Sequence, residues 1–352
     1  CLPAPTGIRV NSLLAAFATG AARPAVTDKE QVDALYRRNR MRVLIAITVG
    51  YAIAYTCRLA LSVVKKPLID EGIFSPEELG LIGSALFYTY AFGKLVNGFL
   101  ADHANMKIFF ATGVIASALI NIGMGFSTIL WLSVALWALN GWFQGFGAPS
   151  GIVTLTAWFS NRERGRFYGI WSTAHSFGEG LTYYVVAIFV AWLGWRTGFW
   201  VPGLFCILAG IGIYLLMQDR PPTLGLPTVA DWKDDHLAPS APPETRVLTI
   251  QFSILKIPAL WILALSSATM YVSRYAIASW GILYLQEARG YELAEASLFM
   301  AIYTIAGVAG CLLFGFLSDT LFSARRPPAN LLFAVAELVG LVLIFYGPPN
   351  AY

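Results

Sequence analysis

Apolar residues gather along this chain into nine blocks, each close to the length of a membrane-spanning helix. The blocks cover residues 43–64, 79–100, 107–127, 129–157, 166–193, 198–218, 259–286, 294–317 and 329–347. A helix of about 20 residues crosses the hydrocarbon core and satisfies its own backbone hydrogen bonds there. The pattern therefore predicts an all-α, polytopic membrane protein. The fourth and fifth blocks are longer than one crossing needs, and Pro149 lies inside the fourth, so we expect both helices to be tilted or broken.

One long polar stretch divides the nine blocks into two groups. Residues 219–257 hold six prolines and several charged residues, a composition typical of a linker. The pattern predicts four regions: an N-terminal segment over 1–42, a six-helix bundle over 43–218, a cytoplasmic linker over 219–257 and a partial bundle of about three helices over 258–352.

Lysine and arginine are distributed unevenly between the two sides of the predicted membrane. Of the 24 such residues, 17 fall on the side that holds the N-terminus, four fall on the other side and three lie within spans. Cytoplasmic loops of membrane proteins carry the excess of these cations. We therefore expect a cytoplasmic N-terminus and a location in the cell inner membrane.

Composition narrows the function classes. The chain is 57% hydrophobic and 12% charged, whereas a soluble globular protein carries about 25% charged residues. An ordinary soluble enzyme is excluded, and no nucleophile, base and orienting acid come together in the polar segments. The formal charge of +4 lies mostly in the loops, where membrane topology explains it, so we expect no nucleic-acid partner. We also expect no cofactor and no metal.

A short passage occurs twice. Gly98–Asp102 reads Gly-Phe-Leu-Ala-Asp and Gly315–Asp319 reads Gly-Phe-Leu-Ser-Asp, at an offset of 217, while Arg58 and Arg274 are 216 apart. Nearly equal offsets predict two parallel repeats of six helices, the second truncated after about three. This arrangement and the Gly-x-Leu-x-Asp passages resemble the major facilitator superfamily.

Three cations lie inside the predicted spans, namely Arg58, Lys94 and Arg274. Each costs about 2.5 to 3.5 kcal/mol at the bilayer centre on insertion scales, and only Glu179 and Glu337 lie within spans as acids. A polar cavity that binds an anion would explain this excess. The fork of arginine suits phosphate, so we expect Arg58 and Arg274, at matching depths in the two repeats, to form a clamp. The alternative is that these cations reach the headgroups from near the helix ends.

His175 and Glu179 are four residues apart, which places them on one face of the fifth predicted helix. His175 could donate to a phosphate and change its protonation near neutral pH, or it could be a packing residue. Glu179 could pair with Lys94, relay protons or stay neutral, and the residues do not decide among these. The glycines of Gly141–Gly145 are more simply explained by close helix packing than by a ligand loop.

Several passages together resemble the organophosphate:phosphate antiporters, the group of glycerol-3-phosphate and hexose-6-phosphate transporters. The passages are Tyr51 leading to Arg58, Thr89–Lys94, Gly141–Gly145, Glu163–Gly165, Ala174–His175, and Tyr271–Arg274 followed by Trp280. Thr27–Arg37 and Asp219–Trp232 are most similar to the hexose-phosphate sensor branch.

The resemblance implies roles for single residues. Phosphate would be bound by Arg58 and Arg274, with Lys94 and His175 lining the same cavity. Glu179, Asp102 and Asp319 are candidates for gating or proton coupling. Leu59 and the Ser176–Glu179 passage depart from the family, which usually has a lysine, an asparagine and paired glycines there.

The expected function is an inner-membrane antiporter that exchanges a sugar phosphate for inorganic phosphate by alternating access. The alternative is a sugar-phosphate receptor that signals to a membrane histidine kinase with little transport. Efflux of cationic drugs on the same fold would need more acids facing the cavity than Glu179 and Glu337. The partners would be an organophosphate, inorganic phosphate and the lipid bilayer, and we expect a monomer.

Overall fold

A computed structural model describes residues 17–235, 256–322 and 326–346 of the chain, and it is helical throughout its membrane part. The N-terminal bundle contains α2 (Lys29–Asp70), α3 (Pro76–His103), α4 (Met106–Met124), α5 (Leu130–Gln144), α6 (Gly147–Trp158), α7 (Asn161–Leu181), the π-helical turn η1 (Thr182–Val186), α8 (Ala187–Leu193) and α9 (Thr197–Leu216). The short 3₁₀-helix η2 (Pro221–Leu224) and helix α10 (Val229–Lys233) follow. The second group contains α12 (Pro258–Arg289), α13 (Leu293–Thr320) and α14 (Arg326–Tyr346).

The nine expected spans coincide with these helices, and the all-α fold is confirmed. Six of the described helical segments are long and apolar enough to cross a membrane: Lys29–Asp70, Pro76–His103, Met106–Met124, Asn161–Leu193, Thr197–Leu216 and Leu293–Cys311. The expected irregularity of the fourth and fifth spans is also found. The fourth breaks between α5 and α6, and the fifth contains η1, a π-helical turn of the kind that often marks functional regions.

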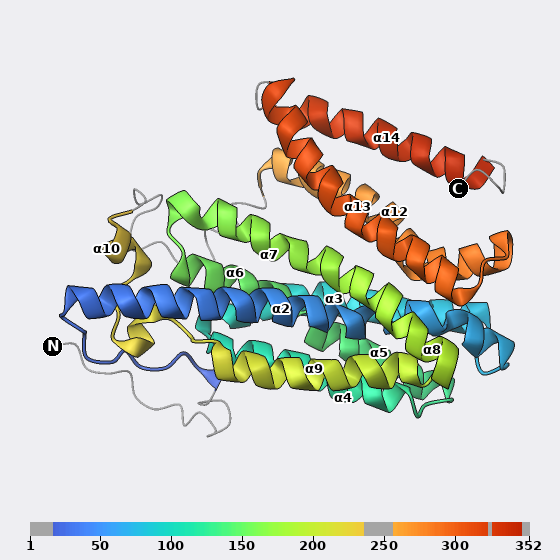
Figure 1. Cartoon of the computed structure of the whole chain (residues 1–352), viewed down its shortest axis with the longest axis horizontal. Helices are drawn as coiled ribbons and strands as arrows, with labels where there is room; N and C mark the ends of the chain where they lie inside the picture. Colours follow the sequence, from blue (N-terminus) through green and yellow to red (C-terminus); the bar gives the residue numbers. More distant parts are fainter. Residues whose placement is uncertain (1–16, 236–255, 323–325, 347–352) are drawn as a thin grey trace.

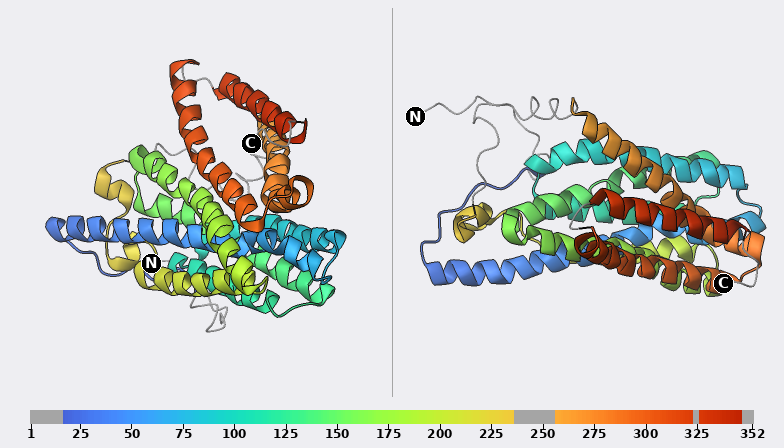
Figure 2. Two further views of the ribbon diagram at one scale, coloured as in Figure 1. Left: turned by 45° about the vertical axis from the view of Figure 1, so that its right-hand side comes forward. Right: turned by 90° about the horizontal axis from the view of Figure 1, so that it is seen from above.

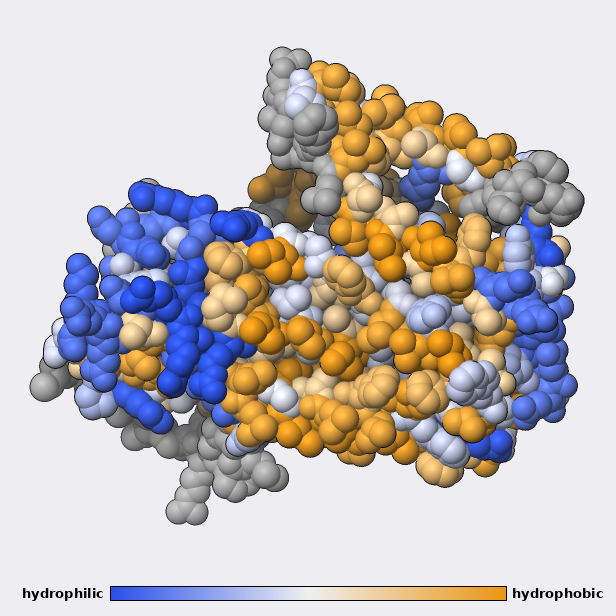
Figure 3. Space-filling view, in the orientation of Figure 1, coloured by the Kyte–Doolittle hydropathy of each residue, from blue (hydrophilic) through white to orange (hydrophobic). Residues whose placement is uncertain are grey.

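On the face that Figure 3 shows, a broad apolar belt covers the middle of the molecule and both ends are hydrophilic. Large apolar side chains of the helices are exposed, for example Trp192 at 81% and Trp131 at 70%. A soluble protein rarely leaves so extensive an apolar surface open. The belt is the surface that a lipid bilayer would cover.

The second group of helices packs along one side of the N-terminal bundle (Figures 1 and 2). Helix α12 contacts α2, and α13 contacts α7, η1 and α8, while α14 lies against α13 on the side away from the bundle. We call the end that holds residues 70–76 and 289–293 the closed end, because contacts of Lys65 and Lys66 join α2 to α12 there. The opposite end holds the start of α2 and helix α10 (Figure 1).

The internal duplication extends to helix boundaries. Helices α3 and α13 are both 28 residues long, and both ends of α13 lie 217 residues after those of α3. The repeated passages Gly98–Asp102 and Gly315–Asp319 form the last turns of these helices. Both helices therefore continue three residues beyond the expected spans 79–100 and 294–317 and include the whole of each passage.

The expected first span was too short at both ends. Helix α2 already begins at Lys29, where the side chain of Asp28 accepts a hydrogen bond from the backbone N–H of Glu30. At the other end it continues to Asp70, so Lys65 and Lys66, expected in an outer loop, lie in the helix. Both ends of α2 carry polar residues, so the hydropathy pattern alone does not show how far the helix extends beyond its apolar part.

The first part of the expected linker is folded. Residues 219–235, here called the clasp, pack against the N-terminal bundle. Trp232 stacks on Tyr36 with ring centroids 4.1 Å apart, and its indole N–H donates to Asp33 at 2.6 Å. The hydroxyl of Tyr36 donates to the carbonyl of Pro227 at 2.6 Å. Residues 236–255, the rest of the expected linker that precedes Lys256, lie outside the described part of the chain.

Helices α7 and α2 approach most closely at Gly178. A Cβ built there would overlap the carbonyl oxygen of Ala52 and lie 2.7 Å from the Cβ of Tyr55. Because backbone atoms cannot move aside easily, only glycine fits this contact. It brings the middle of α7, which carries His175 and Glu179, against the helix that carries Arg58.

We expect Gly178→Ala to destabilise the protein by about 1 to 3 kcal/mol, the usual cost of overpacking. Gly169→Ala is the matched control, because it lies in the same helix and a Cβ there would meet nothing within 4 Å. That change should be neutral or stabilising by up to about 1 kcal/mol, since alanine favours helix. Thermal unfolding of the purified variants in detergent measures both, and equal melting temperatures for the two would contradict the close contact.

Candidate functional site

Arg58 lies in the interior of the molecule, on the middle of α2. Its exposed fraction is 5%, and its guanidinium carbon lies 4.3 Å from the ring centroids of both Tyr55 and Tyr90. Its Nη2 donates to Oε1 of Gln144 at 3.3 Å. Its Nε and Nη1 are buried and have no hydrogen-bond partner. A buried donor without a partner costs free energy, so these two nitrogens, which carry three N–H bonds, make Arg58 a candidate anion ligand.

Arg274 lies on α12, in the other group of helices, and is paired with an acid. Its Nη2 lies 3.0 Å from Oε1 of Glu179, which projects from α7. The side chain of Glu179 is 9% exposed and that of Arg274 is 38% exposed. This ion pair joins the two groups of helices. Of the three roles that the sequence left open for Glu179, pairing is therefore found, but with Arg274 and not with Lys94.

The two arginines line adjoining cavities. A small cavity of about 30 Å³ is bordered by Arg58, Tyr275 and Glu179. A larger one of about 560 Å³ is bordered by Arg274, His175 and again Glu179. Glu179 thus lies at the boundary between them. The two arginines therefore come from different groups of helices and border neighbouring cavities; Arg58 has nitrogens without partners and Arg274 is paired with a carboxylate, while the clamp itself stays a prediction.

Lys94 and His175 stand at the edges of this region. Lys94 is exposed, and its Nζ lies 5.2 Å from the ring centroid of Tyr90, the same ring that covers Arg58. His175 borders the larger cavity, and its ring centroid lies 6.1 Å from that of Tyr55. Both residues therefore lie one aromatic ring away from Arg58.

Of the gating candidates in the repeated passages, Asp102 lies outside this region. Asp102 lines a separate cavity of about 480 Å³ beside the clasp, together with Arg164 and Arg220. Arg220 donates to the backbone carbonyl of Asp102. The side chain of Asp319 lies outside the described part of the structure.

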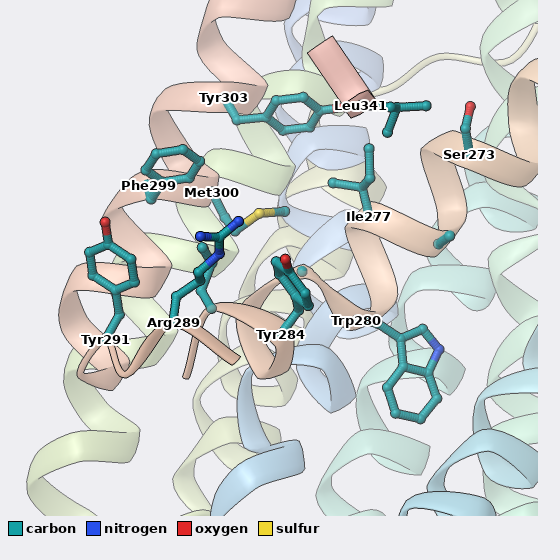
Figure 4. Close-up of a pocket in the computed structure, with 13 residues that line it drawn as sticks. Ser273, Ile277, Trp280, Tyr284, Arg289, Tyr291, Phe299, Met300, Tyr303 and Leu341 are labelled. Atoms are coloured by element: carbon teal, nitrogen blue, oxygen red, sulfur yellow. The ribbon is translucent and has the colours of Figure 1, made fainter. Parts of the chain in front are cut away.

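An apolar groove of about 390 Å³ lies between α12 and α13 near the closed end (Figure 4). Its wall consists mainly of aromatic and aliphatic side chains, among them Ile277, Tyr284 and Met300. The lining also includes one cation, Arg289, beside these apolar side chains. The groove is larger than the cavity beside Arg58, but most of its wall offers no polar group to a phosphate.

Sequence reasoning missed three residues that shape the site: Tyr55, Tyr90 and Gln144. The passages that contain them, Thr89–Lys94 and Gly141–Gly145, contributed to the family resemblance, but Tyr90 and Gln144 were given no role of their own. Tyr55 lies three residues before Arg58, a spacing that places both on one face of a helix. This spacing is the sequence signal that could have identified Tyr55 as a neighbour of Arg58.

At the closed end, a lysine is buried between the two groups of helices. Lys65 is 1% exposed; its Nζ lies 3.2 Å from the ring centroid of Trp280 and donates to the Ser279 hydroxyl at 3.1 Å. Next to it, Lys66 forms an ion pair with Glu287 at 2.6 Å. These contacts seal the closed end by joining α2 to α12.

Comparison with known proteins decides the family. The Major Facilitator Superfamily profile matches residues 47–351. The chain belongs to the major facilitator superfamily. The "Membrane sensor protein UhpC" of Salmonella typhimurium is 38% identical over 333 residues, which cover 94% of this chain and 75% of that protein. A "Probable hexose phosphate transport protein" of Chlamydia muridarum is 34% identical, covering 90% of this chain and 72% of that protein.

A "Glycerol-3-phosphate transporter" of Bacillus subtilis is 33% identical, covering 91% of this chain and 74% of that protein. These relatives confirm the expected branch of the superfamily, that of the organophosphate:phosphate antiporters, and the expectation that the chain is not an enzyme.

Solved structures agree on the fold. The crystal structure of a bacterial homologue of the human lysosomal transporter Spinster, inward-facing and unoccupied, matches with a TM-score of 0.69. It is 19% identical, and the match covers 89% of this chain and 70% of that one. This likeness shows the major facilitator fold alone. The protein is thus a multi-pass membrane protein of that fold.

We expect Trp280→Leu to weaken the seal at the closed end, because it removes the aromatic face that Lys65 contacts. A desolvated cation–π contact contributes about 2 kcal/mol, so the melting temperature of the purified protein should fall. Trp131→Leu is the control, since Trp131 is 70% exposed on α5. Equal melting temperatures for the two variants would show that the lysine gains nothing from the ring.

Proposed function

We propose that this protein exchanges a sugar phosphate, such as a hexose 6-phosphate, for inorganic phosphate across the cell inner membrane. The observation that carries this proposal is the buried guanidinium of Arg58, two of whose nitrogens, Nε and Nη1, have no hydrogen-bond partner. Relatives named as hexose phosphate and glycerol-3-phosphate transporters support the same class of ligand. A phosphoryl group offers the negative charge and the acceptor oxygens that such donors lack.

Arg274 is the second phosphate ligand in this proposal. Its present partner, Glu179, is also an oxyanion, so a phosphoryl group arriving in the larger cavity would replace or share that carboxylate. Lys94 and His175 would contact the rest of the ligand or its phosphate from the edges. Since the two arginines belong to different groups of helices, one ligand held by both would couple the motions of the two groups.

The distribution of cations supports a cytoplasmic N-terminus, with the clasp inside the cell and the closed end outside. The sealing contacts of Lys65 and Lys66 would then close the outer side, leaving access from the cytoplasm. Exchange would require these contacts to open while others form at the cytoplasmic end. No covalent bond is made or broken, and a phosphate gradient supplies the free energy.

A receptor is the second candidate function, supported by the 38% identity to a protein named a membrane sensor. In that case the same cavity would bind external sugar phosphate and signal to a membrane histidine kinase. Uptake of labelled glucose 6-phosphate into vesicles loaded with inorganic phosphate distinguishes the two. An antiporter accumulates label only with phosphate inside, whereas a receptor binds the sugar phosphate without such counterflow.

Arg58→Lys and Arg274→Lys should each weaken binding of inorganic phosphate by at least about tenfold, because the charge remains but the fork of donors is lost. Isothermal titration of the purified protein measures the dissociation constant. Arg196→Lys is the control, because Arg196 is exposed and stacks only on Trp195, away from both cavities. Near-normal phosphate affinity in the Arg58 or Arg274 variant would refute that arginine as a phosphate ligand.

A further inference from the structure

We propose that Gln144 is a positioning residue that sets the orientation of the Arg58 guanidinium before phosphate arrives. This inference rests on the proposed function and adds a role for a residue that touches no ligand itself. The passage Gly141–Gly145 was explained above by helix packing alone. The structure assigns a second role to Gln144, the fourth residue of this passage, which is to orient Arg58.

The amide of Gln144 has a single possible orientation. Its Nε2 donates both hydrogens, one to the carbonyl of Ala54 at 2.9 Å and one to the hydroxyl of Ser117 at 2.8 Å. Neither hydrogen is left for another acceptor. Oε1 must therefore face the other way, and it accepts from Nη2 of Arg58 at 3.3 Å.

A second layer of polar side chains fixes Ser117 in turn. Its hydroxyl donates to Oδ1 of Asn140 at 2.5 Å, which leaves the oxygen lone pairs for Gln144. Nδ2 of Asn140 donates to the carbonyl of Cys57 at 3.0 Å, one residue before Arg58. Ser117 and Asn140 are almost fully buried, and Gln144 is 5% exposed. Polar groups that satisfy one another in a low dielectric hold a defined geometry.

Three contacts together define how the guanidinium lies. The rings of Tyr55 and Tyr90, each 4.3 Å from its carbon, restrict its plane. Gln144 restricts its rotation within that plane by holding Nη2. The other two nitrogens, Nε with one hydrogen and Nη1 with two, have no hydrogen-bond partner. An arginine held in this way loses little further freedom when a phosphoryl group binds.

The helix break explains how Gln144 reaches this place. It is the last residue of α5, and α6 starts at Gly147. Gly141, one turn earlier, lets α5 approach α3 so closely that a Cβ would overlap the carbonyl oxygen of Leu86. Gly141 and Gln144 therefore act together. The glycine lets α5 lie close to α3, and this close packing brings the amide of Gln144 to Arg58.

The test compares two buried amides in the full-length chain. Gln144→Leu removes the contact to Arg58, whereas Asn97→Leu removes an equally buried amide that donates to the carbonyl of Trp142 at 3.3 Å and does not touch Arg58. The melting temperature and the dissociation constant for inorganic phosphate are measured for both. We expect both variants to be less stable, and only Gln144→Leu to bind phosphate roughly three- to tenfold more weakly.

Gln144→Glu provides a second variant of nearly the same shape. Its carboxylate would pair with Arg58 and compete with phosphate, so we expect binding at least as weak as in Gln144→Leu. If Gln144→Leu and Gln144→Glu bind phosphate as tightly as the unaltered protein, or if Asn97→Leu weakens binding equally, the positioning role is refuted while the proposed function stands. If the unaltered protein binds neither inorganic phosphate nor glucose 6-phosphate, the proposed function fails and this inference fails with it.

Discussion

A guanidinium enclosed within the membrane interior needs compensation, and the arrangement around Arg58 supplies it without an acid. Two tyrosine rings and one glutamine oxygen contact the cation, and no carboxylate among the described residues forms an ion pair with it. Aromatic faces and a single amide offset only part of the cost of removing a full charge from water. An anionic ligand would offset the rest of this cost by accepting hydrogen bonds from Nε or Nη1, which have no partner.

Arg58 and Arg274 occupy corresponding positions in the two repeats, but they differ in how their charge is compensated. Arg274 is paired with Glu179, while Arg58 has no carboxylate partner among the described residues. The site is therefore asymmetric in charge as well as in shape. Phosphate could bind Arg58 directly, whereas Arg274 would first have to release Glu179. A bound ligand would therefore alter the Arg274–Glu179 pair, a contact that joins the two groups of helices.

Much of the fold could be predicted from the sequence, because each span is a local pattern of apolar residues. The irregular fourth and fifth helices followed from length alone, and the offset of 217 anticipated the matching boundaries of α3 and α13. Contacts between distant segments could not be predicted in this way. The pairing of Arg274 with Glu179, the burial of Lys65 against Trp280 and the orientation of Gln144 each depend on how helices from different parts of the chain pack. The folded clasp was missed because proline and charge, typical of a linker, also allow a short segment to dock through Trp232.

The most direct measurement is an experimental structure of the full-length chain with bound glucose 6-phosphate. The account predicts that the phosphoryl group contacts Nε or Nη1 of Arg58, and that Arg274 turns from Glu179 toward the same group. A ligand bound elsewhere, with Arg58 still facing only Tyr55, Tyr90 and Gln144 and with the Arg274–Glu179 pair intact, would contradict it.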